Sequence, residues 1–197
     1  MEGAISDLIQ KKLAEGIAVL QAVSADTALH AVLTQAAEKT ASALKSGRKL
    51  MVAGNGGSAA DAQHLATEFV IRLAPGIKRP GLPAIALTTD SSALTAGSND
   101  LGYDAVFARS VEALGSEGDV LIGITTSGNS PSVNNAFIKA REKKMATIGF
   151  LGKDGGTAKA LVDLAITVPS NDTQRIQEGH ITIGHIIFQE VEQEMFG

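Results

Sequence analysis

The chain has no cysteine, and this absence excludes disulfide bonds, thiolate metal sites and a cysteine nucleophile. Any metal ion must then be held by histidine, carboxylate or amide ligands. Tryptophan is also absent, and aromatic residues make up only 4% of the 197 residues, which fits helices packed through small side chains. No segment approaches the roughly 20 apolar residues of a membrane span, and the first residues lack a basic region followed by an apolar run. We therefore expect a cytoplasmic protein with no membrane partner.

Positive charge is in slight deficit, with 17 Lys and Arg against 21 Asp and Glu and a net charge of −4. General nucleic-acid binding needs a basic face, so nucleic acid is not an expected partner. A local pocket can still bind a small anion. With 44% hydrophobic residues and no linker, repeat or low-complexity tract, residues 1–197 are expected to form a single domain.

Helical patterns fill residues 1–46, and short apolar runs alternate with amphipathic segments after that. Apolar residues recur at the spacing of one helix face in the first helix, and a second helix extends from about Asp26 to Lys45. The apolar runs expected to be strands are Lys49 to Ala53, Pro83 to Leu87, Val120 to Thr125, Thr147 to Leu151 and Leu164 to Val168. This order predicts an α/β fold with a doubly wound, five-stranded parallel sheet flanked by helices. The N-terminal helical pair is expected to pack against the sheet layer or against another subunit.

Two loops between an expected strand and an expected helix contain the residue types that bind phosphate: Gly54–Ser58 and Thr125–Ser130. Small residues let backbone N–H groups approach an oxyanion, hydroxyls add donors, and the helix N-terminus supplies partial positive charge. The first loop also fits a G-x-G-x-x-A dinucleotide fingerprint, but the second loop has no role in such a site. The two loops together predict a phosphorylated ligand beyond the carboxyl ends of the strands.

The helix after the first loop carries His64 and Glu68, which lie on one face because they are four residues apart. Such a pair is commonly a surface ion pair, but its helix begins at a phosphate-type loop, so chelation of a metal ion is an equal alternative. A largely apolar C-terminal helix carries His180 and His185, about 140° apart around the helix axis, so they should not share one site. Without further information each is expected to be a core-edge histidine, and Arg175 an ion-pair partner.

The combination of these segments resembles the bacterial phosphoheptose isomerase family of sugar isomerase (SIS) domains. The resemblance spans nearly the whole chain and rests on Gly54–Ser58 with His64 and Glu68, Arg79–Leu87, Asn99 and Asp100, Gly118–Leu121, Thr126–Ser130 and Arg175–Glu178. It implies a flavodoxin-like SIS domain, with residues 1–46 used in packing or oligomerisation and residues 47–197 as the sugar-phosphate-binding core. The implied reaction is the isomerisation of sedoheptulose 7-phosphate to D-glycero-D-manno-heptose 7-phosphate. In bacteria this is the first step of ADP-heptose synthesis for lipopolysaccharide core or other surface heptose.

The resemblance also implies the residues of the site. The residues that would contact the substrate are Asn55, Gly56, Gly57, Ser58, Glu68, Arg72, Asn99, Asp100, Thr125, Thr126, Ser127, Ser130 and Gln177. One zinc ion per subunit would be bound by His64, Glu68, Gln177 and His185. The implied assembly is a homotetramer with sites at subunit interfaces. Thr125 stands where the family often has serine, and the hydroxyl is retained.

The implied chemistry is proton transfer through an enediol, with Glu68 as base and His185 as acid or proton shuttle. A metal acting as Lewis acid competes in part with this scheme, because a glutamate bound tightly to zinc is a weaker base. On one regular helix Gln177 and His185 would lie about 12 Å apart along the axis. Either the helix begins after Gln177, or the two groups at a site come from different copies. The alternative function is a non-catalytic scaffold like the replication-initiator-associating protein, although a scaffold has no need of Glu68 and His185 beside a phosphate loop.

Overall fold

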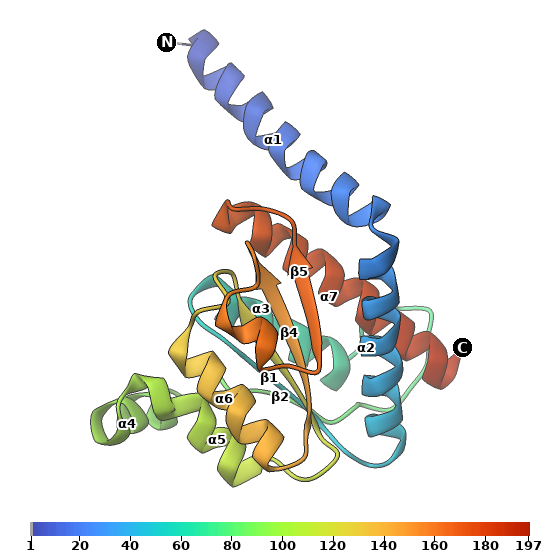
Figure 1. Cartoon of the computed structure of the whole chain (residues 1–197). Helices are drawn as coiled ribbons and strands as arrows, with labels where there is room; N and C mark the ends of the chain where they lie inside the picture. Colours follow the sequence, from blue (N-terminus) through green and yellow to red (C-terminus); the bar gives the residue numbers. More distant parts are fainter. Residues whose placement is uncertain (1) are drawn as a thin grey trace.

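A computed structural model describes residues 2–197, apart from the side chains of residues 2–4 and 6. The chain begins with α1 (Glu2–Ala25) and α2 (Thr27–Lys45), the two helices expected at the N-terminus. Between them the Asp26 side chain accepts a hydrogen bond from the Leu29 N–H at 2.9 Å and caps α2. The pair is bent by 77°, and α1 projects from the molecule (Figure 1). No single described helix is long and apolar enough to cross a bilayer, although this bent pair together passes that test by length and composition.

Five parallel strands form one sheet in the order β2-β1-β3-β4-β5. The strands are β1 (Leu50–Gly54), β2 (Ala84–Ala86), β3 (Val120–Thr125), β4 (Ala146–Gly152) and β5 (Leu164–Val168). The expected five-stranded parallel sheet is confirmed, and the order is that of a flavodoxin-like fold. The chain reverses its direction of winding between the neighbours β1 and β3. Ligands of open α/β sheets bind at such a point, outside the carboxyl ends of the strands.

Helices cover both faces of the sheet, as the doubly wound fold requires (Figure 1). The helices after β1 are α3 (Gly57–Val70), α4 (Ser91–Leu101), α5 (Val106–Leu114), α6 (Pro131–Glu142) and α7 (Thr173–Phe196), with short 3-10 segments at Tyr103–Ala105 and Thr157–Ala160. In β1, Leu50 and Val52 belong to the core shared with α2, α3 and α7, whereas Met51 and Ala53 belong to the opposite core shared with α5 and α6. Burial on both faces explains why the central strands β1, β3 and β4 are unbroken apolar runs.

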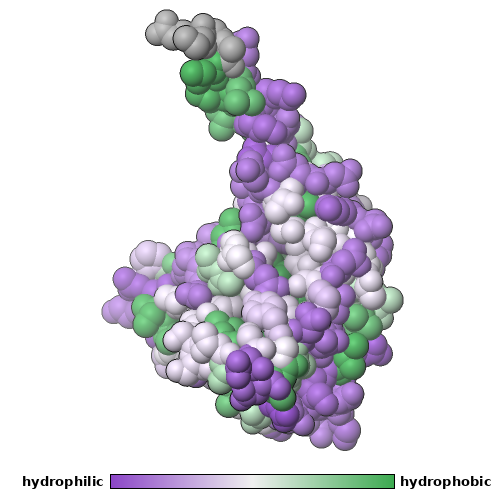
Figure 2. All heavy atoms as spheres, turned by 90° about the vertical axis from the view of Figure 1, so that its left-hand side faces the viewer, coloured by the Kyte–Doolittle hydropathy of each residue, from purple (hydrophilic) through white to green (hydrophobic). Residues whose placement is uncertain are grey.

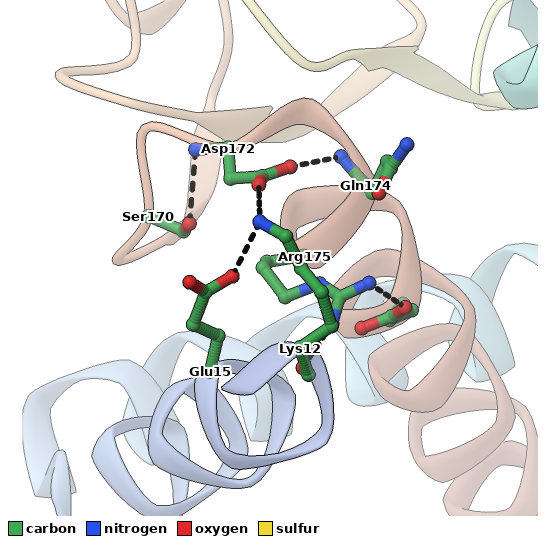
Figure 3. A network of polar contacts seen from close by, with 7 residues as sticks. Lys12, Glu15, Ser170, Asp172, Gln174 and Arg175 are labelled. Atoms are coloured by element: carbon green, nitrogen blue, oxygen red, sulfur yellow. Dashed lines mark hydrogen bonds and ion pairs between the residues drawn. The ribbon is translucent and has the colours of Figure 1, made fainter. Parts of the chain in front are cut away.

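The first turn of α7 holds the middle of α1 (Figure 3). Lys12 Nζ lies 2.7 Å from Glu15 and 3.5 Å from Asp172, whose side chain caps α7. Arg175 Nη1 donates to the Lys12 carbonyl oxygen at 2.5 Å, and Arg175 Nη2 pairs with Glu178 at 2.6 Å. Arg175, expected as an ion-pair partner, therefore also ties α1 to α7.

One face of α1 is apolar and is exposed in the single chain. Its large apolar residues, between 40% and 62% exposed, are Ile5, Leu8, Ile9, Leu13, Ile17 and Leu20. Figure 2 shows hydrophobic surface on this projecting helix. Of the N-terminal pair, α2 packs against β5 and α7, whereas most of α1 does not reach the sheet layer. The N-terminal helical pair is expected to pack either against the sheet layer or against another subunit. For α1, the expectation of packing against the sheet layer is wrong.

Candidate active site

Two loops at the carboxyl edge of the sheet open two helices on neighbouring strands. Gly54–Ser58 joins β1 to α3, Thr125–Ser130 joins β3 to α6, and β1 pairs directly with β3. Among the described residues no side chain caps the first turn of either helix. The Ser58 and Ala59 N–H groups of α3 donate to the Asn55 and Gly56 carbonyl oxygens, and the remaining N–H groups at the two N-termini are available to an anion. Ser58 is buried in the first turn of α3, Thr125 is buried at the end of β3, and Thr126 is half-buried after it. The structure thus brings the two predicted phosphate-type loops to one edge.

Asn55 connects the two loops. Its Nδ2 donates to Ser130 Oγ at 2.8 Å and to Ser132 Oγ at 3.0 Å. Its Oδ1 accepts a hydrogen bond from the Tyr103 hydroxyl at 2.5 Å. Tyr103 was not expected at the site, because it lies between two helices in a segment without periodicity. Its hydroxyl fixes which way the Asn55 amide faces.

The second loop is held in shape by the loop that follows β4. Gly128 has a φ of +67°, and a Cβ at this position would collide with the Gly155 carbonyl oxygen, so only glycine fits. Asn129 Oδ1 accepts hydrogen bonds from the Thr157 N–H at 2.9 Å and from the Thr157 hydroxyl at 2.8 Å. The Asn129 N–H donates to Ser127 Oγ at 3.1 Å. These bonds fix the position of the Ser127 hydroxyl within the loop.

His64, Glu68 and His185 meet between α3 and α7. His64 Nε2 lies 2.8 Å from His185 Nε2 and 3.3 Å from Glu68 Oε1. Donor atoms of the three residues all lie within 4.8 Å of one another. The His64 side chain is 48% exposed and that of Glu68 is 17% exposed, so the group is open to solvent. Three of the four predicted metal ligands therefore come together within one chain.

This donor set fits a zinc ion. Imidazole nitrogen and carboxylate oxygen are both zinc ligands, and two ligand atoms of a tetrahedral ion lie about 3.4 Å apart. The distance from His64 Nε2 to Glu68 Oε1, 3.3 Å, is close to that value, whereas the distance to His185 Nε2, 2.8 Å, is a hydrogen-bond distance that must lengthen to admit the ion. The three ligands of one chain leave room for at least one further ligand on a tetrahedral ion.

Asp61 lies one turn before His64 on α3. Its Oδ2 atom is buried and has no hydrogen-bond partner among the residues that the structure describes. Desolvation raises the pKa of this carboxyl, whereas the neighbouring His64 lowers it. Sequence reasoning did not select Asp61, because an aspartate three residues from a histidine is an ordinary pair on a helix surface.

Gln177 lies apart from this group within one chain. Because α7 begins at Thr173 and contains both Gln177 and His185, the alternative in which the helix begins after Gln177 is wrong. The Gln177 amide packs against Gly57, at a place where a Cβ on residue 57 would collide with it. Gly57 precedes His64 by about 10 Å along α3. The other alternative, ligands from different copies, stays a prediction.

Arg72, Asn99 and Asp100 lie on the surface of the chain. Arg72 follows the C-terminal end of α3, the end opposite to the phosphate-type loop, and is exposed. Asn99 and Asp100 are exposed at the end of α4, where Asn99 Nδ2 donates to Asp100 Oδ1 at 2.7 Å. Within residues 2–197, no hydrogen bond or ion pair joins these three residues to the loops or to His64, Glu68 and His185.

His180 belongs to the core and not to the site. It is 0% exposed, its Nε2 lies 2.8 Å from the Leu151 carbonyl oxygen, and its buried Nδ1 has no partner among the described residues. Burial lowers the pKa of His180 to about 4, against the raising effect of the bond to Leu151. The expectation that His180 and His185 do not share a site is confirmed.

Comparisons with known proteins agree with this geometry. A family model of the SIS domain matches residues 13–152. The phosphoheptose isomerase of Geobacter sulfurreducens is 55% identical to the chain, over 96% of this chain and 98% of that protein. The phosphoheptose isomerase of Burkholderia pseudomallei is 50% identical, over 100% of this chain and 99% of that protein. The structure of phosphoheptose isomerase from Neisseria gonorrhoeae has a TM-score of 0.89 at 41% identity, covering 96% of this chain and 99% of that one. A phosphoheptose isomerase from Francisella tularensis gives a TM-score of 0.89 at 35% identity, covering 95% and 97%.

Proposed function

Because the chain belongs to the phosphoheptose isomerase family of SIS-domain proteins, we propose that it is an aldose–ketose isomerase. It converts sedoheptulose 7-phosphate to D-glycero-D-manno-heptose 7-phosphate. One observation carries this function at the level of residues. The helix that begins at the first phosphate-type loop, α3, also carries His64 and Glu68, and these meet His185 of α7.

The phosphate would bind at the N-terminal ends of α3 and α6. Two helix N-termini supply uncapped N–H groups and partial positive charge, and the chain supplies hydroxyl donors between them. The residues proposed to bind this end of the substrate are Asn55, Gly56, Gly57, Ser58, Thr125, Thr126, Ser127 and Ser130. The bonds from Asn55 to Ser130 and Ser132 support this proposal, because they hold both loops in one arrangement before any ligand binds.

The length of α3 suits a long sugar phosphate. Gly57 and His64 are separated by about 10 Å along the helix. An extended seven-carbon sugar phosphate measures on the order of 9 Å from phosphorus to C2. A substrate with its phosphate at the start of α3 would therefore place C1 and C2 beside Glu68 and His185.

Proton transfer between C1 and C2 needs one base and one acid. Glu68 would accept a proton from C1, next to the C2 carbonyl, while His185 donates a proton to the C2 oxygen and the enediol forms. Glu68 then returns its proton to C2, and His185 takes the proton of the C1 hydroxyl, which leaves the aldehyde at C1. One proton moves from carbon to carbon and one from oxygen to oxygen, so the reaction needs no external oxidant or reductant.

A zinc ion at this site would be held by His64, Glu68 and His185, with Gln177 of another copy as the fourth ligand. When bound, zinc would polarise the sugar oxygens as a Lewis acid, and it would replace His185 as the acid because it would occupy His185 Nε2. The carboxylate of Glu68 has two oxygens, and Oε1 is the one that faces His64 at 3.3 Å. Its Oε2 remains for the proton, which removes part of the conflict between the roles of ligand and base.

The proposed assembly is a homotetramer whose sites lie at subunit boundaries. Two observations support it: the exposed apolar face of α1, and the distance of Gln177 from His64 within one chain. A neighbouring copy would bring Gln177 to the metal and add Arg72, Asn99 and Asp100 to the sugar pocket. In this proposal residues 1–46 serve assembly and residues 47–197 bind the sugar phosphate.

We place the enzyme in the cytoplasm, at the first step of surface heptose synthesis.

A non-catalytic scaffold is not favoured. Such a protein gains nothing from a carboxylate and two imidazoles held within 4.8 Å of one another on the helix of a phosphate loop. The relatives from Geobacter sulfurreducens and Burkholderia pseudomallei, which match the chain over nearly its full length, are phosphoheptose isomerases.

The proposed function is tested by incubating the protein with sedoheptulose 7-phosphate in D2O and following the sugar carbons by NMR. An enediol mechanism predicts an aldoheptose that carries deuterium at C2, because a proton held by Glu68 exchanges with solvent. Failure to form any aldoheptose would reject the isomerase, and an aldoheptose without deuterium would reject proton transfer through an exchanging base.

A further inference from the structure

Arg79 and Glu192 form an ion pair that is closed to solvent. Arg79 Nη2 and Nε both lie 2.5 Å from Glu192 Oε1, and both side chains are 0% exposed. Exchange of such a pair for apolar side chains is often neutral or stabilising, so stability alone does not explain two charges at this place. Their other contacts point to a geometric role.

Arg79 closes the C-terminal end of α3. Its Nη2 donates to the Glu68 carbonyl oxygen at 2.7 Å, and its Nη1 donates to the carbonyl oxygens of Phe69 and Pro80 at 2.9 and 3.0 Å. Together with the hydrogen bond from Nε to Glu192, these bonds engage all three nitrogens of the guanidinium. The last carbonyls of a helix lack intrahelical partners and carry partial negative charge, so a cation there fixes the helix end.

Glu192, on α7, bonds the segment that follows the C-terminal end of α3. It follows His185 by two helical turns, so both side chains lie on the face of α7 that meets α3. Its Oε1 accepts a hydrogen bond from the Leu73 N–H and its Oε2 one from the Ala74 N–H, each at 3.2 Å. Glu192 therefore holds both Arg79 and the segment that leaves α3 against α7.

We propose that the Arg79–Glu192 pair is a positioning device that fixes α3 against α7 and so holds His64 and Glu68 opposite His185. The inference rests on the proposed function, in which these three groups bind the metal and transfer protons. A change of 1 Å in the register of the two helices would alter the 2.8 and 3.3 Å separations at His64 directly. A misplacement of that size lowers rates by roughly 100-fold in enzymes.

Two variants of the full chain test this role. Glu192→Gln keeps the shape but places an amide nitrogen among N–H donors, and Arg79→Lys keeps the charge but loses the forked geometry. Asp119→Asn is the matched control, because Asp119 is also a buried acid in an ion pair, 2.6 Å from Lys49, and its side chain bonds Lys49 and Ser116 rather than α3 or α7. Two quantities are measured: the zinc dissociation constant of metal-stripped protein, in competition with a coloured chelator, and kcat and KM separately.

We expect Glu192→Gln and Arg79→Lys each to weaken zinc binding and lower kcat by on the order of 10 to 100-fold, with KM changed by less than about threefold. Asp119→Asn should leave zinc affinity and kcat within about twofold of the wild type. Wild-type zinc affinity and kcat in the Arg79 and Glu192 variants would overturn the proposal. An equal loss in Asp119→Asn would do the same, because it would reveal a general effect of destabilisation.

The double variant Arg79→Met/Glu192→Met covers the case in which a single variant fails to fold, since neither buried charge is left unpaired. It should fold and still lose zinc affinity and kcat, and a folded double variant with wild-type values would contradict the proposal. The two readouts are independent of each other. If the wild type binds zinc but forms no aldoheptose, the proposed function is rejected, and the effect of the Arg79–Glu192 pair is still measured by zinc affinity. If the wild type turns over without zinc, the effect of the pair is measured by kcat.

Discussion

His64 on α3 and His185 on α7 face each other through their Nε2 atoms at 2.8 Å, with the rings inclined by 74°. At this distance one nitrogen carries a proton and the other accepts it. A metal ion bound to both requires a lone pair on both Nε2 atoms, so the ring that donates must move its proton to Nδ1 when the metal binds. The hydrogen bond between the two rings and metal binding therefore exclude each other.

Glu68→Gln is expected to lower kcat by at least about 100-fold, because general bases contribute roughly 10² to 10⁴ in rate. Binding of sedoheptulose 7-phosphate, measured by calorimetry, should persist, because the amide keeps the shape of the side chain. Zinc content is measured on the same sample, since the amide is a weaker ligand. Glu190→Gln, an exposed change on α7, is the control. Normal turnover in Glu68→Gln would remove the base assignment.

Tyr103→Phe is expected to raise KM by about fivefold with little change in kcat. The variant removes the donor to Asn55 Oδ1, and the loss of one neutral hydrogen bond corresponds to about 1 kcal/mol. The control is Thr95→Ala, which removes an exposed hydroxyl that bonds within α4. If KM stays at the wild-type value, Tyr103 does not help to hold the phosphate loops.

Ile9→Glu should break the assembly without unfolding the chain. Ile9 is 56% exposed on the apolar face of α1, so a charge there costs little in a single chain and much in an interface. Sedimentation velocity should give a smaller species, circular dichroism should stay unchanged, and turnover should fall with the loss of the neighbouring Gln177. Gln10→Glu adds the same charge at the next, polar position and should remain assembled. An intact assembly in Ile9→Glu would exclude this face of α1 as the interface.

His180 should make the protein less stable as pH falls from about 6.5 toward 4. Burial lowers the pKa of His180 in the folded chain to about 4, against 6.5 in the unfolded chain. Between these values only the unfolded chain takes up the proton, so the contribution of the neutral histidine is complete above pH 6.5 and is lost as pH falls, by about 3 kcal/mol in total.

Urea unfolding at several pH values between 7.5 and 4 measures this effect. His180→Gln should lower stability at neutral pH and show a smaller decline on acidification than the wild type. His30→Gln is the control, because His30 is exposed and also bonds a carbonyl, that of Val23 at 3.0 Å. A decline in His180→Gln as steep as that of the wild type would assign the acid sensitivity to other groups.

Much of the fold could be predicted from the sequence, for a physical reason. Burial on both faces turns each strand of a doubly wound sheet into a short apolar run, and the loops after β1 and β3 consist of residues chosen for close approach to a ligand. The projection of α1 could not be predicted. An amphipathic pattern shows that a face must be covered, but it does not say by what.

The site was predictable only where its residues share one element or match a known motif. His64 and Glu68 lie on one helix, so their spacing suffices. The Tyr103 contact to Asn55 and the Arg79–Glu192 pair join residues that are 48 and 113 positions apart. Periodicity carries no information about such pairings, and a single arginine in a loop or a single glutamate in a helix is interpreted as a surface residue.

The central claim is that sedoheptulose 7-phosphate is isomerised at His64, Glu68 and His185. The most direct test is NMR of the sugar carbons during incubation of the substrate with metal-stripped protein, with and without added zinc. The account predicts aldoheptose only when zinc is present. Aldoheptose at the same rate without metal would contradict the metal role and leave acid–base catalysis alone, and no aldoheptose under either condition would contradict the isomerase itself.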